Sequence, residues 1–151
     1  MNKFIIYLKN IVIALVVGGI IGFIISGFID YNELIKPPLA PPGYIFGIVW
    51  SILYILMGIS YSILEINNNL DVKTKKIYYI QLFINALWSI IFFVLKLRFI
   101  SIAWIILLII FIIQMIKLFY SKNKISAYLQ IPYLIWTIFA TYLNIGVYIL
   151  N

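Results

Sequence analysis

Five long apolar runs, separated by short polar breaks, constrain this chain more than any other feature of its sequence. The runs cover about residues 4–29, 44–65, 77–96, 100–119 and 126–150. Each run reaches the ~20 residues that a helix needs to cross a hydrocarbon core of ~30 Å. Because 66% of the 151 residues are hydrophobic and only 10% are charged, a water-soluble domain of this size would not bury them all. The sequence therefore predicts an all-α membrane protein, a five-transmembrane-helix bundle that forms a single domain over residues 1–151.

The basic residues fall between the runs and predict how the bundle is oriented. The side with the N-terminus and the second and fourth breaks holds eight of the eleven basic residues, and the other side holds only Lys36, Lys96 and Arg98. Since cytoplasmic loops are enriched in Lys and Arg, we expect a bacterial plasma membrane protein with its N-terminus in the cytoplasm and its C-terminus outside. The basic residues make no face interleaved with aromatics, so no nucleic-acid partner is expected.

The residue types that most enzymes and metal sites use are absent. The chain contains neither Cys nor His, which excludes disulfides, thiol chemistry and imidazole catalysis. The interiors of the runs carry no charged residue, although a proton-coupled transporter usually needs an ionisable relay in the membrane. The sequence predicts neither a metal site nor a bound cofactor, and it leaves open whether the protein is an enzyme.

Residues 30–43 form the longest break and contain four of the five prolines. Proline fixes its own φ and restricts the residue before it, so this loop is expected to be stiff. Two interpretations, a lid over a cavity and a mere connector, fit the loop equally well. In the run before it, Gly18, Gly22 and Ser26 make a small-residue stripe that allows close helix packing, which we expect within the monomer rather than in a dimer.

Aromatic and amide side chains recur at helical spacing in three of the runs. Polar side chains are costly in lipid, so their positions are informative. One interpretation is a cavity for a flat, largely apolar ligand with polar edges. The alternative is that the amides only bond between helices and the aromatics only pack. The occurrence of three such stripes favours the cavity. The stripes are Trp50 and Tyr54; Gln81, Asn85 and Trp88; and Tyr133, Trp136, Ala140 and Asn144.

Motifs in these runs follow one another in a recognisable order. They are Pro41-Pro42-Gly43 followed by Val49-Trp50 and Leu53-Tyr54, then Gln81-x-x-x-Asn85-x-x-Trp88, then Pro132-Tyr133-x-x-Trp136-x-x-Phe139-Ala140. Together they resemble the TspO/MBR family, also called translocator protein or peripheral benzodiazepine receptor, over the whole chain. The resemblance implies a bundle that is often a homodimer, with a ligand cavity beneath the first loop.

The same resemblance implies a function and a set of site residues. Family members bind porphyrins and haem, and mitochondrial relatives bind benzodiazepine-site drugs, so the implied function is a tetrapyrrole translocator or sensor in the lipid bilayer. The alternative it implies is a light- and oxygen-dependent porphyrin-degrading enzyme that uses Trp50 and Trp136. Because the chain has no His or Cys to ligate iron, metal-free porphyrin is expected to bind more readily than haem. The implied ligand-binding residues are Tyr31, Pro41, Trp50, Tyr54, Gln81, Asn85, Trp88, Tyr133, Trp136, Ala140 and Leu143.

The sequence also departs from the family pattern. Many members carry Trp in the loop where this chain has Asp30 and Leu39, so porphyrin affinity or photochemistry is expected to be reduced if those indoles stack on the ligand. No basic residue follows Tyr142 or Tyr148, and sterol recognition is therefore not predicted. A structural membrane partner that binds no ligand is the third hypothesis.

Overall fold

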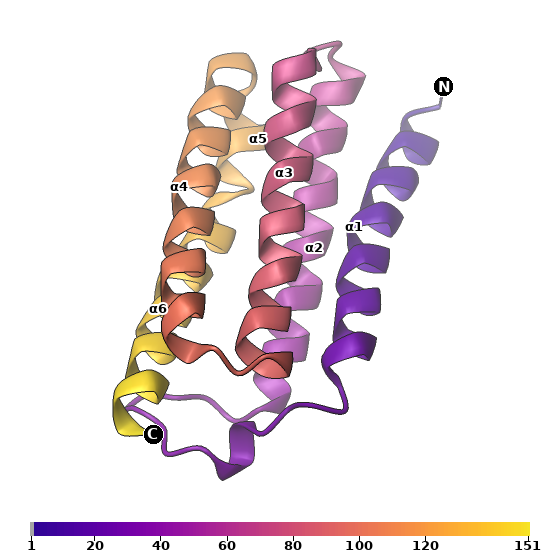
Figure 1. The fold of residues 1–151 in the computed structure, drawn as a ribbon. Coiled ribbons are helices and arrows are strands. Elements are labelled where there is room, and N and C mark those ends of the chain that lie inside the picture. Colours follow the sequence, from indigo (N-terminus) through magenta and orange to yellow (C-terminus); the bar gives the residue numbers. More distant parts are fainter. Residues whose placement is uncertain (1) are drawn as a thin grey trace.

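Five long helices run side by side in the computed structural model, which describes residues 2–151 (Figure 1). Each is long and apolar enough to cross a membrane, and no strand occurs among the described residues. The all-α class and the five-helix bundle predicted from the sequence are thereby confirmed. The long helices are α1 (Lys3–Ile25), α2 (Tyr44–Ile66), α3 (Val72–Ser89), α4 (Arg98–Lys122) and α6 (Ile131–Leu150). The short elements are η1 (Tyr31–Glu33), η2 (Ile90–Val94) and α5 (Lys124–Tyr128).

Helix α3 begins at Val72, earlier than the apolar run predicted, because a polar residue caps it. The Asp71 carboxylate accepts a hydrogen bond from the Thr74 backbone N–H at 2.8 Å and another from the Thr74 hydroxyl at 2.6 Å. These hydrogen bonds, together with the Lys122 ammonium, hold the pKa of Asp71 well below its usual range. The apolar run used for the prediction begins only at residue 77, because the first turn of α3 is polar and faces water.

The last apolar run, predicted over residues 126–150, is divided between two helices. Helix α5 ends at Tyr128, and α6 begins at Ile131 after a short turn. Pro132 lies in the first turn of α6, where its missing N–H is not needed by the helix. Proline therefore marks the start of α6 instead of bending a continuous helix.

The helices pack in a ring in which α1 lies along α2, α3 and α6 flank α4, and α5 fits between α2 and α4. Glycine permits the close approach of α1 to α2. A Cβ added at Gly58 would lie 2.6 Å from the Ile11 Cα and 2.9 Å from the Asn10 carbonyl oxygen. Beside this contact the Asn10 amide donates a buried hydrogen bond to the Ser62 hydroxyl at 3.1 Å. The two helices are thus held together near the end that carries the N-terminus.

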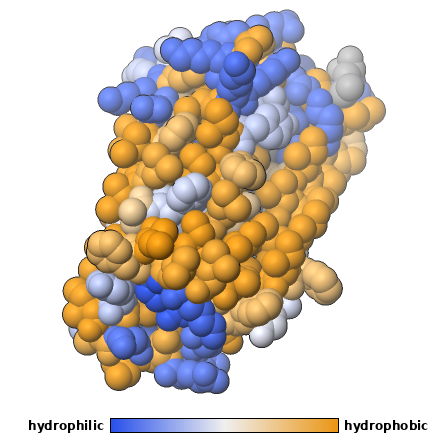
Figure 2. Space-filling view, in the orientation of Figure 1, coloured by the Kyte–Doolittle hydropathy of each residue, from blue (hydrophilic) through white to orange (hydrophobic). Residues whose placement is uncertain are grey.

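Polar residues gather at the two ends of the bundle, with an apolar belt between them (Figure 2). The N-terminus and the α2–α3 and α4–α5 connections lie at one end, and the α1–α2 loop, the α3–α4 turn and the C-terminus lie at the other (Figure 1). Successive connections therefore alternate between the two ends of the bundle, as the count of basic residues on each side assumed. The chain is an integral membrane protein. The plasma membrane and the cytoplasmic position of the N-terminus stay predictions.

Candidate functional site

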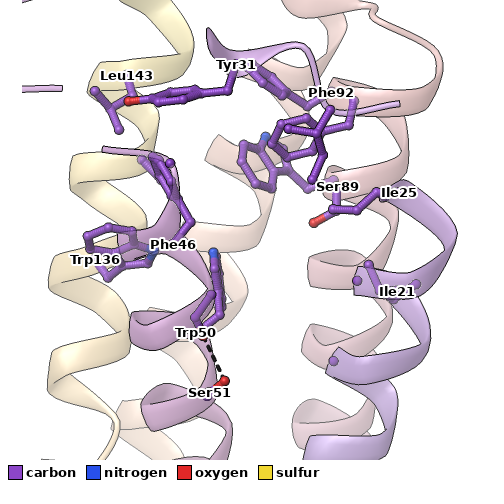
Figure 3. A pocket seen from close by; sticks show the side chains of 18 of the residues that line it. Ile21, Ile25, Tyr31, Phe46, Trp50, Ser51, Ser89, Phe92, Trp136 and Leu143 are labelled. Carbon is purple, nitrogen blue, oxygen red and sulfur yellow. Dashed lines mark hydrogen bonds between the residues drawn. The ribbon is translucent and has the colours of Figure 1, made fainter. Parts of the chain in front are cut away.

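A cavity of about 500 Å³ lies within the bundle beside the α1–α2 loop (Figure 3). Residues of α1, α2, α3, η1, η2 and α6 line it, and none of the lining side chains is charged. Such a lining suits a ligand whose surface is mostly apolar and whose few polar groups are placed at its edges. The aromatic lining residues are Tyr31, Tyr44, Phe46, Trp50, Tyr54, Trp88, Phe92, Phe93 and Trp136.

Helix α2 supplies one aromatic wall of the cavity. Phe46, Trp50 and Tyr54 are spaced four residues apart, so they project from one face of the helix. The ring centroids of Trp50 and Tyr54 are 5.8 Å apart. The Phe46 ring meets Tyr31 edge-on at 5.1 Å and Trp136 at 5.7 Å, which joins the loop and α6 to this wall. The sequence-predicted pairing of Trp50 and Tyr54 on one face is confirmed.

The wall opposite is built from α3, η2 and α6. The Trp88 indole N–H donates to the Asn144 side-chain oxygen at 3.0 Å, and the Asn144 amide donates to the Arg98 carbonyl at 3.1 Å. The π-helical turn η2 follows, closed by the hydrogen bond from the Leu95 N–H to the Ile90 carbonyl at 3.0 Å. The consecutive residues Phe92 and Phe93 of this turn both line the cavity.

Helix α1 closes the remaining side with small residues. A Cβ at Gly18 would lie 2.4 Å from the Tyr54 ring, so Gly18 packs directly on that ring. A Cβ at Gly19 or Gly22 would meet no atom within 4 Å, and both glycines line the cavity. The small-residue stripe therefore serves packing within the monomer at Gly18, as expected, and provides space for the cavity at Gly22.

Tyr31 brings the proline-rich loop into the cavity wall, and Figure 3 shows its ring across the top of the view. Its hydroxyl donates to the Pro41 carbonyl at 2.6 Å, and only 7% of the residue is exposed. Burial raises the pKa of Tyr31. The Lys36 ammonium donates to the Tyr31 carbonyl at 3.0 Å and lies 4.7 Å from the centre of its ring. The loop is therefore a wall of the cavity and not only a link between two helices.

Asp30 anchors the same loop to the α3–α4 turn. Its two carboxylate oxygens accept hydrogen bonds from the Arg98 guanidinium at 2.9 and 3.0 Å. Arg98 also donates to the Phe92 carbonyl at 3.0 Å and covers the Phe92 ring at 4.6 Å. Asp30, at a position where the resemblance implied Trp, thus acts through an ion pair. Leu39, at the other such position, is 84% exposed and does not line the cavity.

Four of the residues implied by the resemblance do not line the cavity but lie behind it. The Tyr54 hydroxyl donates to the Asn85 side-chain oxygen at 3.2 Å, and the Asn85 amide donates to the Tyr133 hydroxyl at 2.7 Å. Tyr133 in turn donates to the Gln81 side-chain oxygen at 2.7 Å. Gln81, Asn85 and Tyr133 therefore hold Tyr54 in place, and Pro41 supplies only the carbonyl that fixes Tyr31. The others line the cavity: Tyr31, Trp50, Tyr54, Trp88, Trp136, Ala140 and Leu143.

Sequence reasoning did not include several lining residues among its site positions. Phe46 was detectable, since it lies one turn before Trp50 on the same helical face. Gly22 was identified as a packing residue rather than as part of a cavity. Phe92 was also detectable, since it lies four residues after Trp88 and continues the stripe of Gln81, Asn85 and Trp88, whereas Phe93 lies outside that spacing.

Most polar groups in the cavity wall already make hydrogen bonds within the protein. The Trp88 indole and the Tyr31 and Tyr54 hydroxyls all have partners within the chain. The buried Trp136 indole N–H has none among the described residues. This nitrogen is itself buried, so its unmet hydrogen bond is unfavourable, and a ligand in the cavity would reach the N–H only if the indole shifted.

Replacing Tyr133 with phenylalanine is expected to destabilise the bundle while leaving the cavity lining unchanged. The variant lacks the hydroxyl that joins Asn85 to Gln81, so both buried amides lose a partner. A buried polar group without a partner costs ~1–3 kcal/mol of unfolding free energy, which thermal unfolding in detergent would measure. Tyr148→Phe on the exposed side of the same helix is the control and should be neutral. Equal destabilisation of both variants would contradict a structural role for the network.

Comparison with known proteins gives one consistent family. The sequence profile of the TspO/MBR family matches residues 10–150. A tryptophan-rich protein TspO of Archaeoglobus fulgidus is 39% identical over 122 residues, which cover 80% of this chain and 79% of that protein. Protein CrtK of Rhodobacter capsulatus is 35% identical over 92% of this chain and 89% of its own length. A tryptophan-rich sensory protein of Cereibacter sphaeroides is 30% identical over 80% of this chain and 76% of its own.

Proposed function

The chain belongs to the TspO/MBR family of membrane proteins, and on this premise we propose that it is a translocator or sensor that binds a metal-free porphyrin. The observation that carries the proposal is the cavity of about 500 Å³, which is walled by indole, phenol and phenyl rings and lined by no charged side chain. Porphyrins are flat and aromatic, so they gain from stacking and edge contacts with such rings. Their polar groups lie at the periphery, where a few donors suffice.

One group beside the loop supports a particular orientation of the porphyrin, although it does not itself line the cavity. The Lys36 ammonium lies over Tyr31, and its hydrogen bonds within the described chain go to the carbonyls of Tyr31 and Leu34. A porphyrin carboxylate placed at this end would gain a charge-assisted hydrogen bond. We therefore place the carboxylate edge of the ligand beside the loop and the apolar edge toward Trp50 and Trp136.

The same cavity is proposed to accept other flat aromatic molecules, including benzodiazepine-site drugs. Haem would bind less favourably than free porphyrin, because the chain has no His or Cys to ligate its iron. A homodimer stays a prediction.

One arrangement favours a second candidate function, the light- and oxygen-dependent degradation of porphyrin. Trp50 and Trp136 both line the cavity, from α2 and α6 respectively. A photoexcited porphyrin would take one electron from an indole, leaving an indole radical cation and a porphyrin radical anion. Molecular oxygen would be the net oxidant and would supply the oxygen atoms that enter the opened porphyrin ring, and the indole radical cation would regain its electron from the oxidised porphyrin intermediate. Indole oxidation of this kind needs no metal. The loop indoles of many relatives are replaced here by Asp30 and Leu39, which favours binding over degradation.

Titration of the purified protein with protoporphyrin IX in detergent tests both functions. We expect saturable quenching of tryptophan fluorescence in the dark at micromolar porphyrin, followed by a stable porphyrin absorbance under light. The Trp50→Phe/Trp136→Phe variant should bind with at most a few-fold weaker affinity, because phenyl rings keep the aromatic walls. Trp104→Phe is the matched control, since Trp104 donates to the Ile84 carbonyl at 2.8 Å and does not line the cavity.

The outcomes separate the hypotheses. Loss of the porphyrin band under light in the native protein, absent in the double variant and retained in Trp104→Phe, would establish degradation instead of simple binding. Absence of saturable quenching in the native protein would contradict porphyrin binding altogether. In that case a structural membrane role or another apolar ligand would replace the proposal.

A further inference from the structure

A second pocket, of about 480 Å³, lies between α1, α2 and α3 at the opposite end of the bundle from the cavity. It is lined in part by Lys9 and Ile13 of α1, Tyr61 and Glu65 of α2, and Lys75 and Tyr79 of α3. Its position is near the edge of the apolar belt, where hydrophilic residues replace hydrophobic ones (Figure 2). Charged, phenolic and aliphatic groups therefore meet in one place at the level of a membrane interface.

The charges in this pocket leave a net positive site. The Glu65 carboxylate is already satisfied, because Lys9 donates to its two oxygens at 2.9 and 3.1 Å and the Asn10 amide lies 3.5 Å away. Lys75 makes no ion pair within residues 2–151. Two lysines and one glutamate thus line the pocket. An anionic group near Lys75 would gain attraction that is strengthened by the low dielectric beside the membrane.

The rest of the pocket combines the apolar side chains of Ile13 and Leu70 and the rings of Tyr61 and Tyr79 with the amides of Asn10 and Asn68. The Tyr61 and Tyr79 rings meet edge-on with centroids 5.7 Å apart, and Tyr79 is 42% exposed. Ile13 is also exposed, on the lipid-facing side of α1. A molecule with an anionic head at Lys75 would place its apolar part along Ile13 and Tyr79. This division into a charged head and an apolar body is the chemistry of a phospholipid.

We propose that this pocket binds the phosphate headgroup of an anionic phospholipid of the adjoining leaflet. The lipid would fill the space between α1 and α3, which contact one another much less than α1 contacts α2. By touching Lys75 on α3 and Ile13 on α1, it would hold α1 against the rest of the bundle. The site is independent of the porphyrin proposal, because the two pockets share no lining residue.

A matched pair of lysine variants tests the proposal. Lys75→Gln removes the ammonium from the pocket, whereas Lys73→Gln removes one from the same helical turn outside the lining. The measurement is the thermal unfolding temperature of each protein in detergent as phosphatidylglycerol is added, with phosphatidylcholine in parallel. We expect phosphatidylglycerol to raise the unfolding temperature of the native protein and of Lys73→Gln at similar lipid concentrations. For Lys75→Gln the apparent affinity for phosphatidylglycerol, taken from the same titration, should be about tenfold weaker.

Three results would overturn the proposal. An equal response of the two variants would indicate general attraction of a basic surface to anionic lipid. If phosphatidylcholine raised the unfolding temperature equally, the pocket would not be recognising the net negative charge of the lipid. The same rise with inorganic phosphate or glycerol phosphate alone would show that the pocket takes free phosphate and does not need the acyl chains.

Discussion

Replacing Ala140 with phenylalanine is expected to abolish saturable binding of protoporphyrin IX while the bundle stays folded. Ala140 lines the cavity one turn after Trp136 on α6, and only 4% of it is exposed. A phenyl ring on its Cβ would project into the space that the porphyrin needs. Because the ligand is rigid and flat, it has little freedom to avoid the added ring. We expect at least ~100-fold weaker affinity, measured by tryptophan quenching in the dark.

A control on the same helix separates this effect from a general disturbance of α6. Ile138 lies two residues away and is 53% exposed toward lipid. Ile138→Phe adds a similar ring outside the cavity, so porphyrin affinity should stay within about twofold of the native value. Thermal unfolding of Ala140→Phe verifies that the variant is folded. Native affinity in a folded Ala140→Phe protein would show that the porphyrin binds somewhere else.

Replacing Gly58 with valine is expected to produce the largest loss of stability of any single substitution considered. The added Cβ alone would lie 2.6 Å from the Ile11 Cα and 2.7 Å from its backbone nitrogen. Backbone atoms cannot turn aside as a side chain can, so α1 would have to move away from α2. Overpacking costs ~1–3 kcal/mol and occasionally more, and a clash with backbone atoms places Gly58→Val at the upper end of that range. The separation of α1 would also break the buried hydrogen bond between Asn10 and Ser62.

The matched control is Gly19→Val on α1. Both substitutions place a β-branched residue in the middle of a helix, so their effects on helix propensity are alike. A Cβ at Gly19 meets no atom within 4 Å, and we expect only a small change there. Unfolding of both variants by heat or denaturing detergent measures the difference. Equal stability of the two would mean that the close contact of α1 with α2 is not needed for folding.

Two features of the site could be predicted because they depend on local rules. The length of the apolar runs predicted the five spanning helices, since any helix of ~20 residues with no charge is stable in lipid. The four-residue spacing of Trp50 and Tyr54 predicted a shared face, because a helix turns by 3.6 residues whatever surrounds it. The ordered motifs identified the family correctly, although no single motif would have been specific.

The sequence by itself thus determined the class of fold, the number of spans and which faces carry aromatic and amide groups. Only the tertiary structure decided which of those groups line the cavity. Asn85 and Trp88 lie on the same face of α3, yet Asn85 lies behind Tyr54 and Trp88 lines the wall. The ion pair of Asp30 with Arg98 is another such outcome. The physical reason is that periodicity specifies the direction of a side chain from its own helix, whereas a cavity depends on where several helices stop touching one another.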